Sequence, residues 1–323
     1  MLVLSGRDVH DLLSYAECAD VMRSALTGLA RGEIQMPLRT VVRPSDAAGF
    51  MGLMPAYAPG AGFGLKALCI MPGNPALGLD THQGGVLLFT ADTGEPVAMV
   101  NASALTEIRT AAVSAVATEL LARRDATELC VIGTGVQGQA HAKAIAATRK
   151  LTGIRLVGRD FGRADARAEL LAADCGGVPV TACADVPFAL EGAGIVVTAT
   201  SSAVPVLSRD WLDDGVHINA VGSCVPSDRE IDTATMTAAR IYADRLDSLR
   251  NEAGDYLLAQ ADGAEPDVCG ELGAVLTGSA PGRSGDAEIT LFKSLGLAAE
   301  DLAAAHYVYE KAKRTGTGTA AEF

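Results

Sequence analysis

Hydrophobic and polar positions follow two different patterns along the chain, and the change falls near residue 129. Apolar residues first recur at helical spacing between residues 16 and 31. Short β-type runs, punctuated by Gly and Pro, are then found at 38–43, 50–54, 63–70, 85–89 and 96–100. A second helical pattern follows over about 103–123. A helix followed by consecutive strands predicts an α+β domain for this part of the chain.

From residue 129 onward, short apolar runs alternate with helical patterns. The predicted strands are 129–132, 154–157, 178–181, 195–199, 217–221 and 241–243. All but the third are almost continuously apolar, as strands covered on both faces must be. The alternation predicts an α/β domain with a doubly wound parallel sheet. A final helix is expected over 296–312, and the small polar residues of 315–323 predict a tail without fixed structure.

A glycine-rich loop follows the first of these parallel strands. In such a loop the first glycine permits a tight turn, the second lets backbone amides approach a pyrophosphate, and the third lets the helix pack closely. The helix N-terminus adds partial positive charge. Between a buried strand and a helix, this spacing predicts a Rossmann-type dinucleotide site. Its candidate residues are Gly133, Thr134, Gly135, Val136, Gln137 and Gly138.

The end of the second parallel strand bears on which dinucleotide is bound. NAD enzymes usually place an acidic residue there for the ribose hydroxyls, but this chain has Gly158 followed by Arg159. Arg159 is suited to a 2′-phosphate and favours NADPH over NADH. Asp160 keeps NADH open, since it could reach a ribose hydroxyl or pair with Arg163. Later strand ends add the candidate cofactor residues Thr198, Ala199, Thr200, Val221 and Gly222, with helix capping as the alternative role for the hydroxyls.

Composition narrows the possible partners and compartments. The net charge of −13 argues against nucleic acid, which requires a basic surface. No apolar run approaches the ~18 residues of a membrane span, and no signal peptide is evident. The seven cysteines form no Cys-x-x-Cys pair, which is typical of reduced thiols rather than disulfides or metal ligands. A cytoplasmic protein without a metal is expected.

Three basic residues, Arg39, Lys66 and Arg109, lie in or beside apolar segments. A buried charge is unfavourable unless it is paired, and no carboxylate is an obvious partner for these three, so an anionic ligand is expected. The alternative is that each residue pairs separately with a distant acid or extends to solvent. His82 could donate a proton or orient a substrate, although a lone histidine is more often structural.

Several segments together carry a family resemblance: 36–40, 54–57, 64–66, 81–83, 109–115, 133–138, 217–222, 292–296 and the acidic pair Glu300 and Asp301. In their order and spacing the chain resembles the ornithine cyclodeaminase/μ-crystallin family over nearly its whole length. The resemblance implies a homodimer with a substrate-binding and dimerisation domain at 1–111, completed by a C-terminal helix within 296–323. It places the Rossmann domain at 112–295. The sequence of residues 292–296 resembles more closely that of the μ-crystallin branch, whose members reduce cyclic ketimines with NAD(P)H.

The resemblance also assigns roles. Arg39, Lys66 and Arg109 would hold the substrate carboxylate, with His82 as a further substrate-site candidate. Lys66 is the leading proton donor, because a desolvated lysine can titrate near neutrality. Lys293 is a second basic candidate, beside the cofactor. Cys224 stands where cyclodeaminases and alanine dehydrogenases of the family have an aspartate, so Lys66 and Cys224 are the candidate catalytic positions. A thiol with a pKa near ~8.5 is a poor base at neutral pH, and a wall residue is the alternative for Cys224.

The leading hypothesis is therefore an NAD(P)H-dependent reductase of small cyclic or alkylated ketimines, that is, imino acids. An ornithine or lysine cyclodeaminase and an alanine dehydrogenase are the enzyme alternatives, and the missing aspartate counts against both. A non-catalytic, crystallin-like protein that binds NADPH and a ligand is the alternative of a different class. Only turnover separates that case from an enzyme.

Overall fold

The computed structural model describes residues 1–322, which form two compact units. One unit contains residues 1–109 and the segment from 296 onward, and the other contains residues 110–295. The division falls within helix α3 (Ala102–Leu121) and just after the last strand of the second unit. The substrate-binding and dimerisation roles expected for the first unit remain predictions at this stage.

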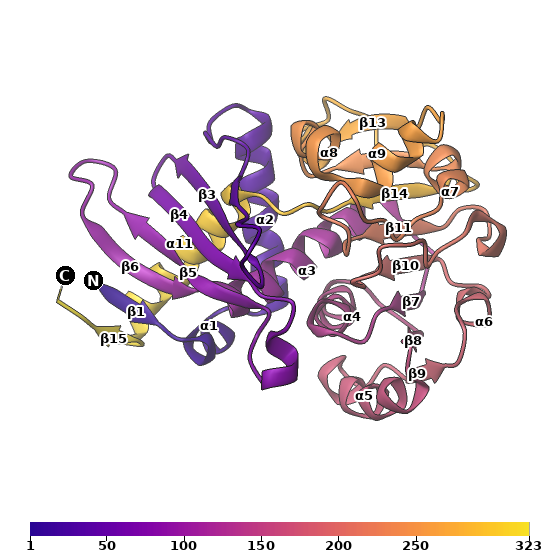
Figure 1. Ribbon diagram of the computed structural model, residues 1–323, viewed down its shortest axis with the longest axis horizontal. Helices are drawn as coiled ribbons and strands as arrows, with labels where there is room; N and C mark the ends of the chain where they lie inside the picture. Colours follow the sequence, from indigo (N-terminus) through magenta and orange to yellow (C-terminus); the bar gives the residue numbers. More distant parts are fainter. Residues whose placement is uncertain (323) are drawn as a thin grey trace. The chain divides into compact units, whose positions relative to one another are not determined.

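The first unit is built on a seven-stranded sheet of order β15-β1-β6-β5-β4-β3-β2 (Figure 1). All its pairings are antiparallel except β1 with β6. Its strands are β1 (Leu2–Leu4), β2 (Thr40–Val42), β3 (Phe50–Ala58), β4 (Gly62–Ile70), β5 (His82–Phe89), β6 (Pro96–Asn101) and β15 (Thr319–Ala320). Its helices are α1 (Gly6–Leu12), α2 (Tyr15–Ala30), the 3-10 turn η1 (Asn74–Leu77) and α11 (Ala298–Thr315). The α+β architecture predicted from the strand run is confirmed.

One face of this sheet is covered by helix α11, which packs across β3, β4 and β5 and against α2. Alternate residues of each strand point to that face, in register from Met54 through Lys66 and Val86 to Val100. All four are buried. A lysine in the middle of this apolar row is the feature that makes the covered face unusual.

The C-terminal tail departs from expectation. After α11, residues Thr319–Ala320 form β15, which pairs with β1, and the amino group of Met1 donates to the carbonyl of Ala321 at 2.9 Å. The prediction of a tail without fixed structure was therefore wrong for the described residues up to 322. Small polar residues carry no strand signal, but the free edge of β1 offers backbone partners to any extended segment.

The second unit contains an eight-stranded sheet of order β13-β12-β14-β11-β10-β7-β8-β9, in which every pairing is parallel. Its strands are β7 (Glu128–Ile132), β8 (Gly153–Val157), β9 (Val180–Cys183), β10 (Ile195–Thr198), β11 (His217–Ala220), β12 (Arg240–Ala243), β13 (Asp267–Glu271) and β14 (Thr290–Lys293). The chain winds from β7 outward through β8 and β9, then returns to β10 on the other side of β7. This is the doubly wound, Rossmann-type topology that the sequence predicted, with its switch point between β7 and β10.

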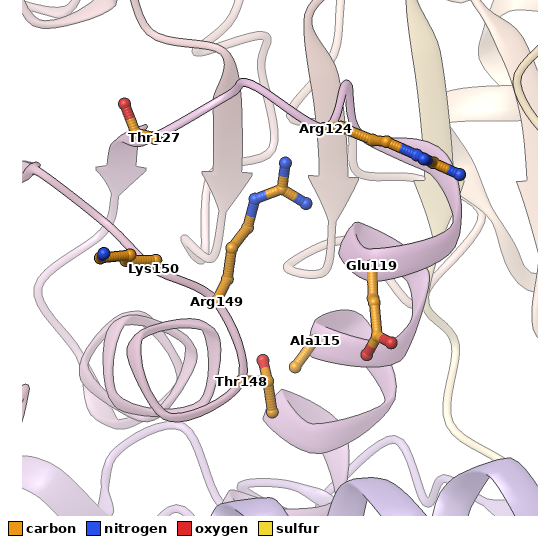
Figure 2. A pocket seen from close by; sticks show the side chains of 7 residues that line it. All are labelled: Ala115, Glu119, Arg124, Thr127, Thr148, Arg149 and Lys150. Carbon is orange, nitrogen blue, oxygen red and sulfur yellow. The ribbon is translucent and has the colours of Figure 1, made fainter.

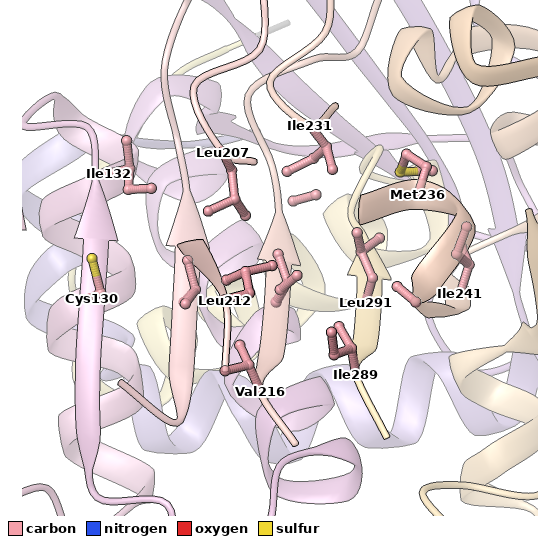
Figure 3. Close-up of a cluster of buried hydrophobic side chains, with 14 of the residues drawn as sticks. Cys130, Ile132, Leu207, Leu212, Val216, Ile231, Met236, Ile241, Ile289 and Leu291 are labelled. Carbon is pink, nitrogen blue, oxygen red and sulfur yellow. The ribbon is translucent and has the colours of Figure 1, made fainter. Parts of the chain in front are cut away.

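The helices of this unit connect successive strands. They are α4 (Val136–Thr148), α5 (Phe161–Asp174), α6 (Val186–Leu190), the 3-10 turn η2 (Arg209–Trp211), α7 (Thr233–Ala238), α8 (Leu246–Glu252), α9 (Gly254–Ala261) and α10 (Leu272–Leu276). A cluster of buried side chains on the sheet, including Ile132, Ile218 and Leu291, forms its core (Figure 3). β9 alternates between exposed and covered positions because it is the edge strand, which explains its weaker apolar pattern. β13 and β14 were not predicted.

Candidate cofactor and substrate sites

The glycine loop lies between β7 and α4, at the carboxyl end of the parallel strands. Gly133 has φ +124°, and a Cβ there would lie 2.3 Å from the carbonyl oxygen of Ala199, in the loop after β10. A Cβ on Gly138 would lie 1.8 Å from the carbonyl oxygen of Gly133. Any side chain at these two positions would force the loops apart, so the motif's first and third glycines are required by packing, as predicted.

The second glycine faces open space instead. A Cβ on Gly135 would meet nothing within 4 Å among the described atoms, and Gly135 caps α4 without any side-chain hydrogen bond. The first backbone N–H groups of α4, from Val136 to Gly138, have no partner within the helix and can donate to an anion such as a pyrophosphate. This arrangement fits a bound dinucleotide.

Asp160 lies just after the end of β8. Its side chain accepts a hydrogen bond from the backbone N–H of Arg163 at 3.0 Å and so caps α5. Arg159 is exposed beside it. Gly158 packs against Thr134, since a Cβ there would lie 2.7 Å from the Thr134 methyl group. Thr134 thus helps to place the β8 end beside the glycine loop.

A buried glutamate connects the two strand ends on the other side of the switch point. Glu230 accepts hydrogen bonds from Thr198 Oγ1 at 2.9 Å, the backbone N–H of Thr200 at 2.6 Å and that of Gly222 at 2.6 Å. Burial raises the pKa of this carboxyl, against the lowering effect of Lys293. The Thr198 hydroxyl is committed to Glu230, so any contact of Thr198 with a cofactor would come from its backbone.

Lys293, a candidate cofactor residue, belongs to the same buried network. Its Nζ donates to Asp255 at 2.7 Å, and the other oxygen of Asp255 accepts the backbone N–H groups of Glu230 and Ile231. Burial would lower the pKa of Lys293, but Asp255, Cys224 and Glu230 together raise it. Sequence reasoning missed Glu230 and Asp255, because neither lies in a motif and their partners are distant in sequence.

The cations of the first unit converge on α11. Lys66 Nζ donates to Asp301 Oδ1 at 2.9 Å, and Arg109 Nε donates to the same oxygen at 2.9 Å. Arg109 Nη1 also donates to Glu300 Oε2 at 2.8 Å. The premise that these cations have no carboxylate nearby was wrong, because Glu300 and Asp301 reach Lys66 and Arg109 from the first turn of a helix that is 191 to 235 positions away.

Arg39 joins the group through the backbone. Its Nη2 donates to the carbonyl of Gly296 at 2.9 Å. A Cβ at Gly296 would lie 2.6 Å from Arg109 Nη1, so the two guanidinium groups approach the same residue. The structure thus brings together the three predicted cations. Lys66 and Arg109 pair with the carboxylates of Glu300 and Asp301, and Arg39 lies beside them.

The cluster shifts the ionisation of its members. Burial lowers the pKa of Lys66 to about 8, with Asp301 opposing and Arg109 adding to the shift. Burial would raise the pKa of Asp301, but Arg109 and Lys66 hold it below its ordinary value. Burial, Lys66 and Arg109 lower the pKa of His82 to about 4, so the imidazole is neutral at pH 7.

Cys224 is half-buried after β11. Its Sγ lies 3.6 Å from the carbonyl oxygen of Val221 and 3.9 Å from that of Ser294. The nearby acids are otherwise engaged: Asp228 accepts from Ser227, and Asp232 caps α7 by accepting the Thr235 N–H at 2.8 Å. The described contacts therefore give no carboxylate in the place of the missing aspartate.

A basic depression at the opposite end of the second sheet is a different feature (Figure 2). It lies before β7, whereas the glycine loop lies after it. Arg149 donates to the carbonyls of Thr118 in α3 and of Arg123 and Ala126 in the segment that follows the helix. The residues that line the depression are Ala115, Glu119, Arg124, Thr127, Thr148, Arg149 and Lys150.

Residues 1–322 contain neither a group of metal-ligating side chains nor a helix that could span a membrane. No three His, Cys, Asp or Glu side chains are grouped so that they could hold a metal ion. No helix is both long and apolar enough to cross a bilayer.

Comparisons with known proteins agree with the predicted family. Residues 1–316 match the model of the ornithine cyclodeaminase/mu-crystallin family. The chain is 36% identical to a Delta(1)-pyrroline-2-carboxylate reductase of Bacillus cereus, covering 100% of both chains. It is 35% identical to the ketimine reductase mu-crystallin of Mus musculus, covering 95% of this chain and 96% of that one. The structure of Thermococcus litoralis Delta(1)-pyrroline-2-carboxylate reductase in complex with NADH and L-proline superposes with a TM-score of 0.96 at 32% identity, covering 99% of this chain and 100% of that one.

Proposed function

Because the chain belongs to the ornithine cyclodeaminase/mu-crystallin family, we propose that it is an NAD(P)H-dependent reductase of small cyclic or alkylated ketimines, that is, imino acids. The relatives named above are reductases of C=N bonds in imino acids. The observation that carries the proposal is the convergence of three basic side chains: Lys66 and Arg109 are buried, and half-buried Arg39 donates to Gly296 beside Arg109. Such a cluster suits a ligand with a carboxylate.

The residues proposed to hold the dinucleotide all surround the carboxyl ends of β7, β8, β10 and β11. When bound, the nicotinamide would supply the hydride. The glycine loop and the N-terminus of α4 would hold the pyrophosphate. Exposed Arg159 supports NADPH over NADH, since Asp160 is occupied in capping α5 and no acidic side chain is left free at the end of β8 among the described contacts.

The proposed substrate contacts follow from the geometry of the cations. Arg39 and Arg109 approach Gly296 together and can bind a carboxylate through several parallel hydrogen bonds. Lys66 is proposed to keep the imine nitrogen protonated, because its pKa near 8 leaves it mostly charged at pH 7 while its proton can still be released. Neutral His82 is proposed to line this site as a hydrogen-bonding side chain rather than as a charge.

Cys224 supports reduction over cyclodeamination. Reducing a preformed imine needs an anchored carboxylate, a hydride and at most one proton. Cyclodeamination also requires oxidation of an amine, attack by a second amine and loss of ammonia, steps that call for an ionised carboxylate. Asp228 and Asp232 are held by other contacts, so Cys224 is proposed as a wall residue.

A homodimer is proposed from the uncovered face of the first sheet. Cross-strand neighbours Pro55, Leu65, Leu87 and Met99 point away from α11, and Phe63 and Met99 are 47% and 40% exposed. An apolar sheet face of this extent is a typical site of protein association. A second copy of the chain would cover it. The seven free cysteines further support a reducing, cytoplasmic location.

The decisive experiment follows NADPH oxidation by the purified protein. The panel contains cyclic five- and six-membered imino acids, pyruvate with ammonia or methylamine, and ornithine with NAD. Turnover of a cyclic or alkylated imino acid is the expected result. Binding of NADPH without turnover of any of these compounds would instead support a crystallin-like binding protein, and ammonia release from ornithine would support a cyclodeaminase.

The Arg109→Ala variant tests the substrate site separately. It removes a charge-assisted interaction worth roughly 1.5–3 kcal/mol, so kcat/KM for the imino acid should fall at least tenfold. NADPH affinity should remain nearly unchanged. Loss of cofactor binding with intact affinity for the imino acid would assign Arg109 to the wrong ligand.

A further inference from the structure

Glu230 lies in the connection between β11 and α7 and is fully buried. Its two carboxylate oxygens accept three hydrogen bonds, from Thr198 at the end of β10, from Thr200 after β10 and from Gly222 after β11. Two backbone segments far apart in sequence are therefore attached to one side chain. No other contact described above connects these two loops through a side chain.

The surrounding structure is shaped to admit this carboxylate. A Cβ at Gly222 would lie 2.5 Å from the Glu230 carboxyl carbon and 2.2 Å from the carbonyl oxygen of Thr200, so only glycine fits there. Beneath it, Asp255 accepts the backbone N–H of Glu230 at 2.7 Å and is itself paired with Lys293. A buried charge is retained only when it is fully bonded in this way.

The two loops lie where the nicotinamide half of a dinucleotide would bind. They follow the strands on one side of the switch point, whereas the glycine loop and Arg159 follow β7 and β8. In a doubly wound sheet a dinucleotide lies across the carboxyl ends, with its adenosine half on the β8 side and its nicotinamide half on the β10 side. The loops held by Glu230 thus border the nicotinamide half.

We propose that Glu230 is a positioning residue that fixes the loops after β10 and β11 for the nicotinamide half of the cofactor. The inference rests on the proposed function, because it requires a dinucleotide at this site. Glu230 itself does not touch the cofactor; it acts through the backbone of Thr200 and Gly222. A carboxylate is needed because all three surrounding groups are donors, and an amide would turn an N–H₂ group toward at least one backbone N–H.

The Glu230→Gln variant tests this inference by calorimetric titration with two ligands. NADPH occupies both halves of the site, whereas adenosine 2′,5′-bisphosphate occupies only the adenosine half. One buried donor loses its acceptor, so the Kd for NADPH should rise roughly tenfold or more. The Kd for adenosine 2′,5′-bisphosphate should change less than twofold. The same comparison with NADH and ADP applies if NADH is the preferred cofactor.

Two further variants make the test specific. Glu128→Gln makes the same chemical change at the start of β7, at the far end of the sheet, and should alter neither Kd. Thr198→Val removes one of the three donors while keeping the side chain's shape, and should weaken NADPH alone by about two- to fivefold. Thr198→Val decides the question if Glu230→Gln does not fold.

Three results would overturn the inference. The first is unchanged NADPH binding in Glu230→Gln, or in Thr198→Val where the glutamine variant does not fold. The second is an equal loss of both ligands in a folded variant, which would indicate general damage to the domain. The third is failure of the unaltered protein to bind either dinucleotide, which would refute the proposed function as well. The first two refute the inference alone.

Discussion

Replacing Asp301 by Asn should change how kcat/KM depends on pH. The basic limb of this profile, where activity falls as the pH rises, should move to lower pH. Asp301 Oδ1 lies 2.9 Å from Lys66 Nζ, and both side chains are buried. Burial lowers the pKa of Lys66 to about 8, and the charge of Asp301 is the main factor opposing a larger drop. Removing that charge leaves the ammonium group with burial and with the repulsion of Arg109, so its pKa must fall.

The size of the shift follows from the contact. An opposite charge at such a distance changes a pKa by about 1–3 units, equivalent to about 1.4–4 kcal/mol. If Lys66 is the proton donor, as proposed, its protonated form is the active one in the reductive direction, and activity is lost as the pH rises through its pKa. The limb should therefore move from near pH 8 in the unaltered protein to between roughly pH 5 and 7 in Asp301→Asn.

The assay is kcat/KM for a cyclic imino acid across pH at saturating NADPH. Ionisation of the free imino acid contributes equally to every variant, so only the difference between profiles is interpreted. Glu300→Gln is the matched control: Glu300 is equally buried and pairs with Arg109 at 2.8 Å, but makes no contact with Lys66 among those described. Its limb should stay near pH 8. Losing one member of a buried pair destabilises a protein by about 3–5 kcal/mol, so the profiles are measured below each variant's unfolding temperature.

A limb that remains near pH 8 in Asp301→Asn would refute the assignment of Lys66 as the titrating proton donor. So would a shift toward higher pH, because removal of a carboxylate cannot stabilise the ammonium form. An equal shift in Glu300→Gln would mean that the limb reports the total charge of the cluster rather than the Lys66–Asp301 contact.

Three further predictions test other parts of the proposal. Arg159→Ala should raise the Kd for NADPH roughly tenfold and leave that for NADH nearly unchanged in a fluorescence titration; equal affinities of the unaltered protein for both would refute the NADPH preference. Cys224→Ala should keep most of the reductase activity, and the unaltered protein should release no ammonia from ornithine or lysine; a loss of several orders of magnitude in a folded variant would give the thiol a chemical role. Phe63→Asp with Met99→Glu should convert a dimer to a monomer in light scattering, whereas Leu170→Glu on α5 should not; a dimer that survives the double change would place the interface elsewhere.

The parts of the fold that could be predicted depend on local patterns. Parallel strands such as β7 and β10 are buried on both faces, so their apolar runs are continuous and their positions were found almost to the residue. β13 was missed because it is an edge strand containing Asp267 and Gly270, and β15 because two small residues carry no apolar signal. Edge strands are held by backbone pairing, which leaves little trace in side-chain chemistry.

The glycine loop could be predicted from sequence, whereas the buried Glu230 in the same domain could not. The glycines at 133, 135 and 138 have a fixed spacing because a single turn must meet a single helix, so the spacing alone identifies them. Glu230 satisfies donors at Thr198, Thr200 and Gly222 by crossing from another segment, and no spacing rule connects these residues. A buried polar network of this kind forms only when segments distant in sequence meet in the folded chain, so the sequence alone does not reveal it.

The pairing of the predicted cations could not be found from their sequence neighbours. Arg39, Lys66 and Arg109 were expected to need an anion because no carboxylate was an obvious partner, yet Asp301 is bonded to Lys66 across 235 residues and to Arg109 across 192. The two carboxylates of α11 hold Lys66 and Arg109 in fixed directions. Without these acids the two buried cations would be uncompensated, which would be prohibitive. The pairing therefore makes it possible for Lys66 and Arg109 to be held in place before any ligand binds.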